Sequence, residues 1–447
     1  MLTGIRLRAN PTENQKLILN QWMGCARFIW NAKCKEEAYY NTFARKYYPV
    51  GTYAPIDQTT SQFKDNELTP WLKSCPSQIL RNSSSNWYST YQKYMKRICG
   101  KPKEKKKSSY SSIHLTNEIF NFKRCDDGVT RLFIGSKTNN IGYLSFKPHK
   151  RFNLPNSIYI INDCGKYYIS FCYETDKKAE RKGQVKVRAK TGKVNAQEML
   201  DMLAMSGEEW LNDNVIGIDR GVAIPVHTGI AAYDYEQSTK EKQLKSERYI
   251  KRYQRRMARQ VKGSSRRNKT KNKLNNEYRK VRNRRKDYCH KTSRKIVDSG
   301  RVFIFEDLKI KNMTKKAKPK KDVNGNYLRN NKKAKSGLNR VILNVGWSML
   351  ESQVKYKSKV EGKASFKINA SYTSQECSRC EHIDSANRKS QSVFCCTECG
   401  YEANADENAA LVIKKRAIKL LKDPGTGLTE NDVLYSVTGR KLKSVPR

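Results

Sequence analysis

The chain has 447 residues, of which 90 are Lys or Arg and 42 are Asp or Glu, so its formal net charge is +48. A charge this large calls for a polyanionic partner, and we expect nucleic acid rather than a small-molecule substrate. No apolar run approaches the roughly 18 residues of a spanning helix, so the sequence predicts no membrane partner. The first residues, MLTGIRLRANPTENQ, lack the apolar core of a signal peptide.

Length and composition also indicate the number of domains and the cellular compartment of the protein. Hydrophobic residues make up 37% of the chain, which is enough for several cores and excludes wholesale disorder. At about 150 residues per domain we expect about three domains. The 13 cysteines are an odd number, and nine of them are scattered without a framework. This pattern is typical of reduced thiols, so we expect an intracellular protein.

Residues 1–111 divide into a first strand and a helical unit. The alternating apolar residues of 1–10 predict a strand, and Thr12 with Gln15 forms a capping box at the start of a helix. A second helix is expected over about 77–98. The helical unit, residues 11–111, ends in the basic loop GKPKEKKKSSY.

In residues 112–212 the apolar residues recur at every second position, which is typical of strands. Ser157–Ile161 and Tyr167–Tyr173 flank the turn sequence Asn162-Asp163-Cys164-Gly165 and predict a hairpin. We predict a small β-barrel here, and a charged linker over 176–213 that joins it to the C-terminal half of the chain.

Three acids lie at the ends of predicted strands or at the start of a predicted helix. Asp219 and Glu306 each close a short apolar strand, and Asp406 opens a helix expected over Asn404–Leu420. An acid at a strand end is usually a cap or a surface charge. Three of them in so basic a chain favour a site for two Mg²⁺ ions about 4 Å apart, which could hydrolyse a phosphodiester.

The most basic segment is 251–295, with 20 Lys and Arg residues against two acids. Apolar residues at helical spacing on both sides of Gly263-Ser264-Ser265 predict a helical hairpin over 244–297. Its apolar seam is thin and its like charges repel, so we expect it to bind phosphates rather than only to face solvent. The arginines expected to bind nucleic acid are Arg255, Arg256, Arg266, Arg267, Arg284 and Arg285.

Two segments show no apolar period. Residues 309–337 are rich in Lys, Asn and Gly, and we predict a mobile lid loop there. Residues 423–447 contain Pro424-Gly425-Thr426-Gly427 and predict a flexible basic tail.

Four cysteines have the spacing of a metal site. Cys377-x-x-Cys380 and Cys396-x-x-Cys399 are separated by 15 residues. Two such pairs predict one tetrahedral Zn²⁺ ion, and four protein ligands leave no open position, so the zinc is structural. Neither the neighbouring Cys395 nor His382 is expected to be a ligand.

These motifs together resemble the TnpB family, the RNA-guided nucleases encoded by insertion sequences and related to miniature type V CRISPR effectors. The resemblance is carried by GIDRGVAIPV around Asp219, FIFEDLKIKNM around Glu306, YTSQECSRC, FCCTECGYEANADENAA around Asp406, and LRANPTENQKLILNQWMGCARFIWN near the N-terminus. It covers most of the chain.

The resemblance implies a multidomain α+β fold. Residues 11–111 would be the helical recognition lobe, and residues 1–10 with 112–212 the β-barrel wedge domain and its linker. An RNase H-like (RuvC) α/β nuclease domain would span 213–371 and 404–422, with a zinc ribbon inserted at 372–403.

The resemblance also implies a function. The protein would bind a guide RNA derived from a transposon end and cut double-stranded target DNA beside a short flanking motif, in the cytoplasm or nucleoid of a prokaryote. Asp219, Glu306 and Asp406 would be its catalytic, magnesium-binding residues, and base pairing would supply sequence specificity. Two alternatives stay open: a miniature type V CRISPR effector, and a nuclease-inactive RNA-guided repressor, which should have lost at least one acid. A recombinase is disfavoured because no Tyr or Ser nucleophile has a recognisable context.

Overall fold

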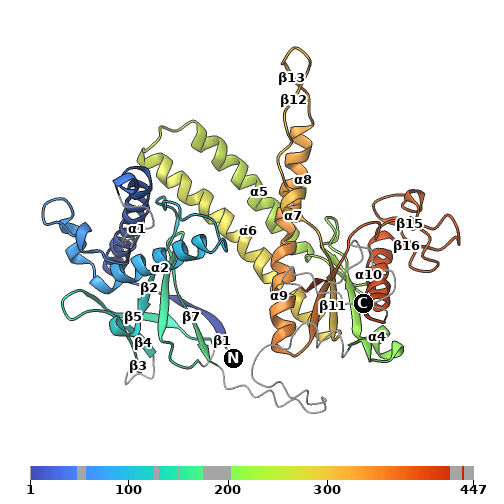
Figure 1. Cartoon of the computed structure of the whole chain (residues 1–447), viewed down its shortest axis with the longest axis horizontal. Helices are drawn as coiled ribbons and strands as arrows, with labels where there is room; N and C mark the ends of the chain where they lie inside the picture. Colours follow the sequence, from blue (N-terminus) through green and yellow to red (C-terminus); the bar gives the residue numbers. More distant parts are fainter. Residues whose placement is uncertain are drawn as a thin grey trace. The chain divides into compact units, whose positions relative to one another are not determined.

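The computed structural model describes residues 2–47, 57–124, 130–149, 152–174, 203–422 and 435–436. The chain forms two compact units, one of residues 1–185 and 262–276 and the other of residues 186–261 and 277–447 (Figure 1). Most of the linker expected over 176–213 and of the tail expected over 423–447 lies outside the described residues.

The first unit combines helices with an antiparallel sheet. Its described elements are β1 (Leu2–Ala9), α1 (Glu13–Thr42), η1 (Ala44–Tyr47), η2 (Ser61–Phe63), η3 (Pro70–Ser74), α2 (Ser77–Met95), β2 (Tyr110–Thr116), η4 (Asn117–Ile119), β3 (Phe120–Arg124), β4 (Thr130–Gly135), β5 (Asn140–Lys147), β6 (Ser157–Asp163) and β7 (Lys166–Glu174), together with the start of α6 (Ser265–Asp298). The expected capping box is confirmed, because Thr12 Oγ1 accepts from the Gln15 N–H at 3.3 Å and Gln15 Oε1 from the Thr12 N–H at 3.1 Å.

The seven strands form one sheet in the order β2-β6-β7-β1-β5-β4-β3. The predicted hairpin is confirmed as β6 and β7, whose turn holds Cys164 and Gly165 at φ +54° and +78°. The two outermost strands, β2 and β3, are consecutive in the chain and joined by η4 alone. A three-residue connection keeps one end of each close together, so the sheet must curl.

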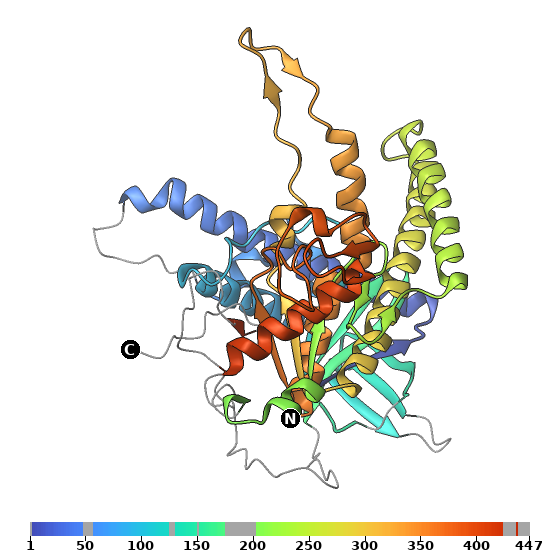
Figure 2. The ribbon, with the colours of Figure 1, turned by 90° about the vertical axis from the view of Figure 1, so that its right-hand side faces the viewer.

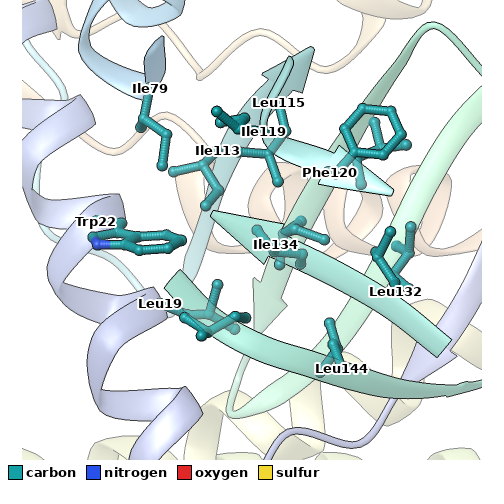
Figure 3. Packing of buried hydrophobic residues seen from close by; sticks show 14 of the residues in the cluster. Leu19, Trp22, Ile79, Ile113, Leu115, Ile119, Phe120, Leu132, Ile134 and Leu144 are labelled. Atoms are coloured by element: carbon teal, nitrogen blue, oxygen red, sulfur yellow. The ribbon is translucent and has the colours of Figure 1, made fainter. Parts of the chain in front are cut away.

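One apolar core joins the helices to this sheet. Figure 3 shows Leu19 and Trp22 of α1 and Ile79 of α2 beside strand residues such as Leu115 and Leu132, and all of them are buried. The residues expected as a separate helical unit thus share their main core with the strands. A smaller cluster between the helices contains Trp30, Cys34 and Trp87.

The second unit is built around a mainly parallel sheet. Its described elements are α4 (Glu208–Asn214), β8 (Val215–Ile218), β9 (Val226–His227), β10 (Ala232–Tyr233), α5 (Gln237–Ala258), the rest of α6, β11 (Val302–Glu306), α7 (Ile310–Met313), β12 (Lys320–Lys321), β13 (Tyr327–Leu328), α8 (Lys332–Val345), α9 (Trp347–Val360), β14 (Ala364–Ile368), η5 (Ser385–Asn387), β15 (Val393–Cys395), β16 (Glu402–Asn404), α10 (Ala405–Lys422) and β17 (Tyr435–Ser436).

The sheet order is β17-β14-β11-β8, with β8, β11 and β14 parallel and β17 antiparallel. An antiparallel bridge between Asp219 and His227 connects the end of β8 to the hairpin of β9 and β10. Alternate residues of β11 enter different cores: Val302 and Ile304 pack with α10, and Phe303 and Phe305 pack with α6 and α9. Burial on both faces explains the continuous apolar runs of these strands.

The segment expected as an irregular lid loop, residues 309–337, has more structure than predicted. It contains α7, the two short strands β12 and β13, and the start of α8. The turn between the strands is fixed by Asp322 Oδ1, which accepts from the N–H groups of Asn324 and Asn326 at 3.0 and 2.8 Å. Figures 1 and 2 both show this hairpin projecting beyond the end of α8.

The expected basic helical hairpin is present as α5 and α6, with bounds slightly wider than predicted. In the second unit, Tyr278 of α6 accepts from Gln254 Nε2 at 2.7 Å, and Arg284 donates to Ser246 of α5 at 2.7 Å. Within the described part of the chain, no helix is both long and apolar enough to cross a bilayer.

Candidate active site and metal centre

The first two candidate acids lie at one edge of the parallel sheet. Phe305 of β11 is in register with Ile218 of β8, so the next residues along these strands, Glu306 and Asp219, lie side by side. Parallel strands end at the same edge, which is why acids that close separate apolar runs come together.

The third acid, Asp406, is brought to this edge by the first turn of α10. A Cβ atom added at Gly221, two residues after Asp219, would lie 3.4 Å from Asp406 Oδ2. The approach depends on Gly217 of β8, where an added Cβ would lie 2.1 Å from the backbone oxygen of Ala410 in α10. Only glycine allows strand and helix this close.

Burial raises the pKa values of all three acids, and crowding by like charges adds to the shift at Asp219. Burial, followed by the negative charges of Glu306 and Asp406, raises the pKa of Asp219 to about 8. Burial also raises the pKa of Glu306, against a hydrogen bond from Thr373, whose Oγ1 donates to Glu306 Oε1 at 2.6 Å. Burial raises the pKa of Asp406 against the charge of Arg388. A bound cation would relieve this cost of holding like charges together.

The carboxylate oxygens of the three acids do not form a closed ligand set in this structure. Among the described residues, the four cysteines are the group whose possible metal-ligand atoms all lie within 4.8 Å of one another. The carboxylate oxygens of the three acids are farther apart than this. None of the three makes an ion pair within the described parts of the chain. Carboxylate oxygens free of cation partners are the donors that Mg²⁺ takes, so the donor chemistry fits.

One cation lies near all three acids. The charge of Arg388, in the segment between the two cysteine pairs, lowers the pKa of Asp219, Glu306 and Asp406 alike. Its guanidinium donates to the Gln391 carbonyl at 3.3 Å and forms no ion pair with a described acid. A half-buried arginine in this position can contact an anionic group bound at the acids.

The four predicted cysteines are brought together. Their sulfur atoms all lie within 4.8 Å of one another, with Cys377 and Cys399 3.7 Å apart and Cys380 and Cys396 3.6 Å apart. A tetrahedral zinc with Zn–S bonds of about 2.3 Å places its sulfurs about 3.8 Å apart, so the spacing fits this metal.

Two asparagines connect the cysteine segment to α10. Asn404 Oδ1 accepts from the Asp406 N–H at 2.9 Å and so caps the helix. Asn408 is fully buried; its Oδ1 accepts from the Ser378 N–H at 2.9 Å and its Nδ2 donates to the Glu376 carbonyl at 2.7 Å. The position of Asp406 is therefore coupled to the fold around Cys377.

The structure divides the six candidate arginines. Arg255, Arg256 and Arg266 are exposed, whereas Arg267, Arg284 and Arg285 are partly buried. Arg284 donates to Ser246 and Arg285 to the Leu343 carbonyl. Burial lowers the pKa of Arg284, as expected for a cation used inside the fold.

Four further residues of the site, Arg220, Thr373, Arg388 and Asn408, were not predicted from the sequence. A usable signal was present for one of them: Arg220 is a charged residue directly after the acid of an apolar strand. The others lie in segments whose side-chain direction depends on distant contacts.

Three family models match separate parts of the chain. A model described as a helix-turn-helix domain of OrfB from IS605 matches residues 1–41, which here form one strand and one long helix. A model of OrfB from IS605, described as a probable transposase, matches residues 172–317 and includes Asp219 and Glu306. A model described as a Cas12f1-like TNB domain matches residues 347–413 and includes Asp406 and the four cysteines.

The curated proteins that are similar in sequence include an RNA-guided and a CRISPR-associated nuclease. "Putative RNA-guided DNA endonuclease InsQ" of Escherichia coli K12 is 27% identical over 92% of this chain and 90% of its own length. The CRISPR-associated endodeoxyribonuclease Cas12f1 of Sulfoacidibacillus thermotolerans is 32% identical over 44% of each chain.

A solved structure shares the fold. The chain in a cryo-EM structure of a Cas12f1–sgRNA–target DNA complex aligns with a TM-score of 0.52 and 12% identity, covering 93% of this chain and 98% of that chain. The alignment extends over both units.

Proposed function

We propose that the chain is a member of the TnpB family and an RNA-guided DNA endonuclease that cuts double-stranded DNA beside a short flanking motif. Its partners are a guide RNA derived from a transposon end and the target DNA, which a net charge of +48 is suited to bind. The observation that carries the proposal is the meeting of Asp219, Glu306 and Asp406 at one sheet edge of so basic a chain.

The fold supports a finer assignment. The sheet β17-β14-β11-β8, extended by the bridge from Asp219 to the β9–β10 hairpin, is the arrangement expected of an RNase H-like (RuvC) domain over 213–371 and 404–422. The curled sheet of the first unit is proposed as the wedge barrel, with α1 and α2 as its recognition lobe. We propose that the protein acts in the cytoplasm or nucleoid of a prokaryotic cell, and its proposed DNA substrate supports this.

Three acids would hold the catalytic cations. We propose Asp219, Glu306 and Asp406 as the residues that would hold two Mg²⁺ ions. Two Mg²⁺ ions there would activate a water and stabilise the leaving oxygen of a phosphodiester. Thr373 orients the Glu306 carboxylate, and Arg388 would contribute positive charge near a phosphate bound at the acids.

The four cysteines would hold one structural Zn²⁺, in the ribbon proposed at 372–403. Since Asn408 bonds to the backbone of Glu376 and Ser378, the ribbon supports the first turn of α10 as well as its own fold. We therefore expect the metal to influence cleavage without taking part in it.

Replacing Cys377 by Ser should weaken zinc binding and lower the melting temperature, because metal binding and local folding are coupled. The loss should also reduce cleavage, since Asp406 loses its support through Asn408. Elemental analysis should find one zinc per wild-type chain and less in the variant. The matched control is Cys395→Ser, which changes a neighbouring thiol outside the group of four and should leave the zinc content unchanged. Wild-type protein without zinc would contradict the assignment.

The exposed arginines of the basic hairpin are proposed to hold nucleic-acid phosphates. Replacing Arg255, Arg256 and Arg266 by Ala should weaken binding about equally for different guides. It should also flatten the slope of log affinity against log salt by about 0.7–0.9 unit for each phosphate that is no longer neutralised. Binding measured from low to moderate salt tests this, and an unchanged slope would contradict it.

A second pair serves as the contrast. Arg284→Ala and Arg285→Ala remove hydrogen bonds inside the second unit, to Ser246 and to the Leu343 carbonyl. These changes should lower the free energy of unfolding by about 1–2 kcal/mol each and leave the salt slope close to that of the wild type.

The alternatives separate on particular features. A nuclease-inactive repressor is disfavoured because all three acids are present. A CRISPR effector would require a guide transcribed from a repeat array. Sequencing the RNA that copurifies with the protein decides between these sources: a transposon-end RNA supports the proposal, and a repeat-derived RNA or no bound RNA contradicts it.

A further inference from the structure

Arg220 is a buried cation beside the proposed catalytic edge. Its side chain is fully buried, and it directly follows Asp219. Placing a guanidinium inside a fold is costly unless its bonds are satisfied by groups held in good geometry. The groups that Arg220 contacts therefore indicate its structural role.

Those contacts join the ends of two strands. One Nη of Arg220 donates to the backbone carbonyl of Glu306, and the other donates to Glu351 Oε2 at 2.7 Å. The guanidinium carbon also lies 5.4 Å from the centre of the Phe305 ring. The residue after the first acid is thus bonded to the backbone of the second.

A chain of alternating charges continues from this point. Glu351 of α9 accepts from Lys367 of β14 at 2.9 Å, and Lys367 pairs with Asp307 at 3.4 Å. Two carboxylates close to the site, Glu351 and Asp307, are therefore neutralised by cations. Asp219, Glu306 and Asp406 make no such pair among the described residues.

We infer that Arg220 is a positioning residue, which fixes the spacing of Asp219 and Glu306 for a divalent cation and keeps Glu351 from competing for it. This inference rests on the proposed function of the same edge. Residues that orient metal ligands typically change metal affinity by about 10- to 100-fold when replaced. Arg220 would act in this way without touching the cation or the substrate.

The test measures Mn²⁺ binding to the full-length, RNA-free chain by electron paramagnetic resonance. Arg220→Gln should bind Mn²⁺ at least about 10-fold more weakly than the wild type. Arg294→Gln is the matched control, since it breaks ion pairs with Asp298 and Glu361 elsewhere in the same unit. Its Mn²⁺ affinity should equal that of the wild type.

A double variant separates positioning from stability. Arg220→Gln alone leaves the partly buried Glu351 with fewer partners and should lower the melting temperature. Adding Glu351→Gln removes that charge and should restore most of the melting temperature, while Mn²⁺ binding stays weak. If Arg220→Gln does not fold, the double variant alone provides the affinity.

The outcomes are distinct. Wild-type affinity in Arg220→Gln, or affinity restored together with melting temperature in the double variant, would overturn the inference. Mn²⁺ binding that is the same in wild type and Asp219→Ala would overturn it too. Weak binding in both Arg220 variants with no guide-dependent cleavage by the wild type would support the inference for the cation site and contradict the proposed function.

Discussion

Replacing Asp219 by Ala should reduce target cleavage by at least about 1,000-fold, which corresponds to about 4 kcal/mol of transition-state stabilisation. Glu306→Ala and Asp406→Ala should have effects of the same order, because each removes a carboxylate from the same edge. Guide RNA and target DNA should bind as well as to the wild type, since pairing and phosphate contacts do not need these acids. Cleavage time courses and binding titrations on the same samples measure both quantities.

Asp219→Ala should be more stable than the wild type although it is less active. Asp219 is buried and lies near the charges of Glu306 and Asp406, so removing it relieves the cost of burial and of repulsion in the metal-free protein. The melting temperature without divalent cations should therefore rise in Asp219→Ala.

The exposed acid Asp298 provides the control for the cleavage measurements, and Asp298→Ala should cleave at the wild-type rate. Cleavage by Asp219→Ala at the wild-type rate would contradict the assignment of the catalytic acids.

Gly217→Ala should destabilise the second unit by about 3 kcal/mol, or about 10 °C in melting temperature. The added methyl group would lie 2.1 Å from the Ala410 backbone oxygen, a distance that no rotamer change can relieve. Helix α10 must move away from β8, and Asp406 moves with it. Cleavage should therefore fall even at temperatures where the variant stays folded.

Gly337→Ala is the matched substitution for this experiment. Gly337 lies within α8, and an added Cβ would meet nothing within 4 Å. Alanine favours a helix over glycine, so this variant should be as stable as the wild type or more stable by up to about 1 kcal/mol. Thermal melts of the two variants side by side measure the difference. Equal melting temperatures would show that close packing of β8 on α10 is not required.

The candidate site could be predicted from the sequence where its signals are local. Each of these signals lies within a few residues: a cysteine pair with two residues between its members, an acid that closes an apolar strand, and Thr12 with Gln15 at a helix start. The four cysteines do meet. Asp219 and Glu306 lie side by side because parallel strands end at one edge, and α10 brings Asp406 to the same edge.

The features that sequence analysis missed depend on distant partners. From the sequence, Arg284 is indistinguishable from the surface cations around it, whereas in the structure it donates a hydrogen bond to Ser246 of α5. Arg220 gains its role from Glu351, 131 residues later in the chain. The hairpin in 309–337 was missed because its strands have two residues each, too short for a period, and its turn relies on the Asp322 side chain.

The most direct measurement gives the purified protein two guide RNAs that differ only in their target-pairing segment, and maps the cuts on a DNA that carries both targets beside the same flanking motif. We predict Mg²⁺-dependent double-strand breaks that move from one target to the other with the guide. Cuts that stay in place when the guide changes, or that form without RNA, would contradict RNA-guided cleavage by this chain.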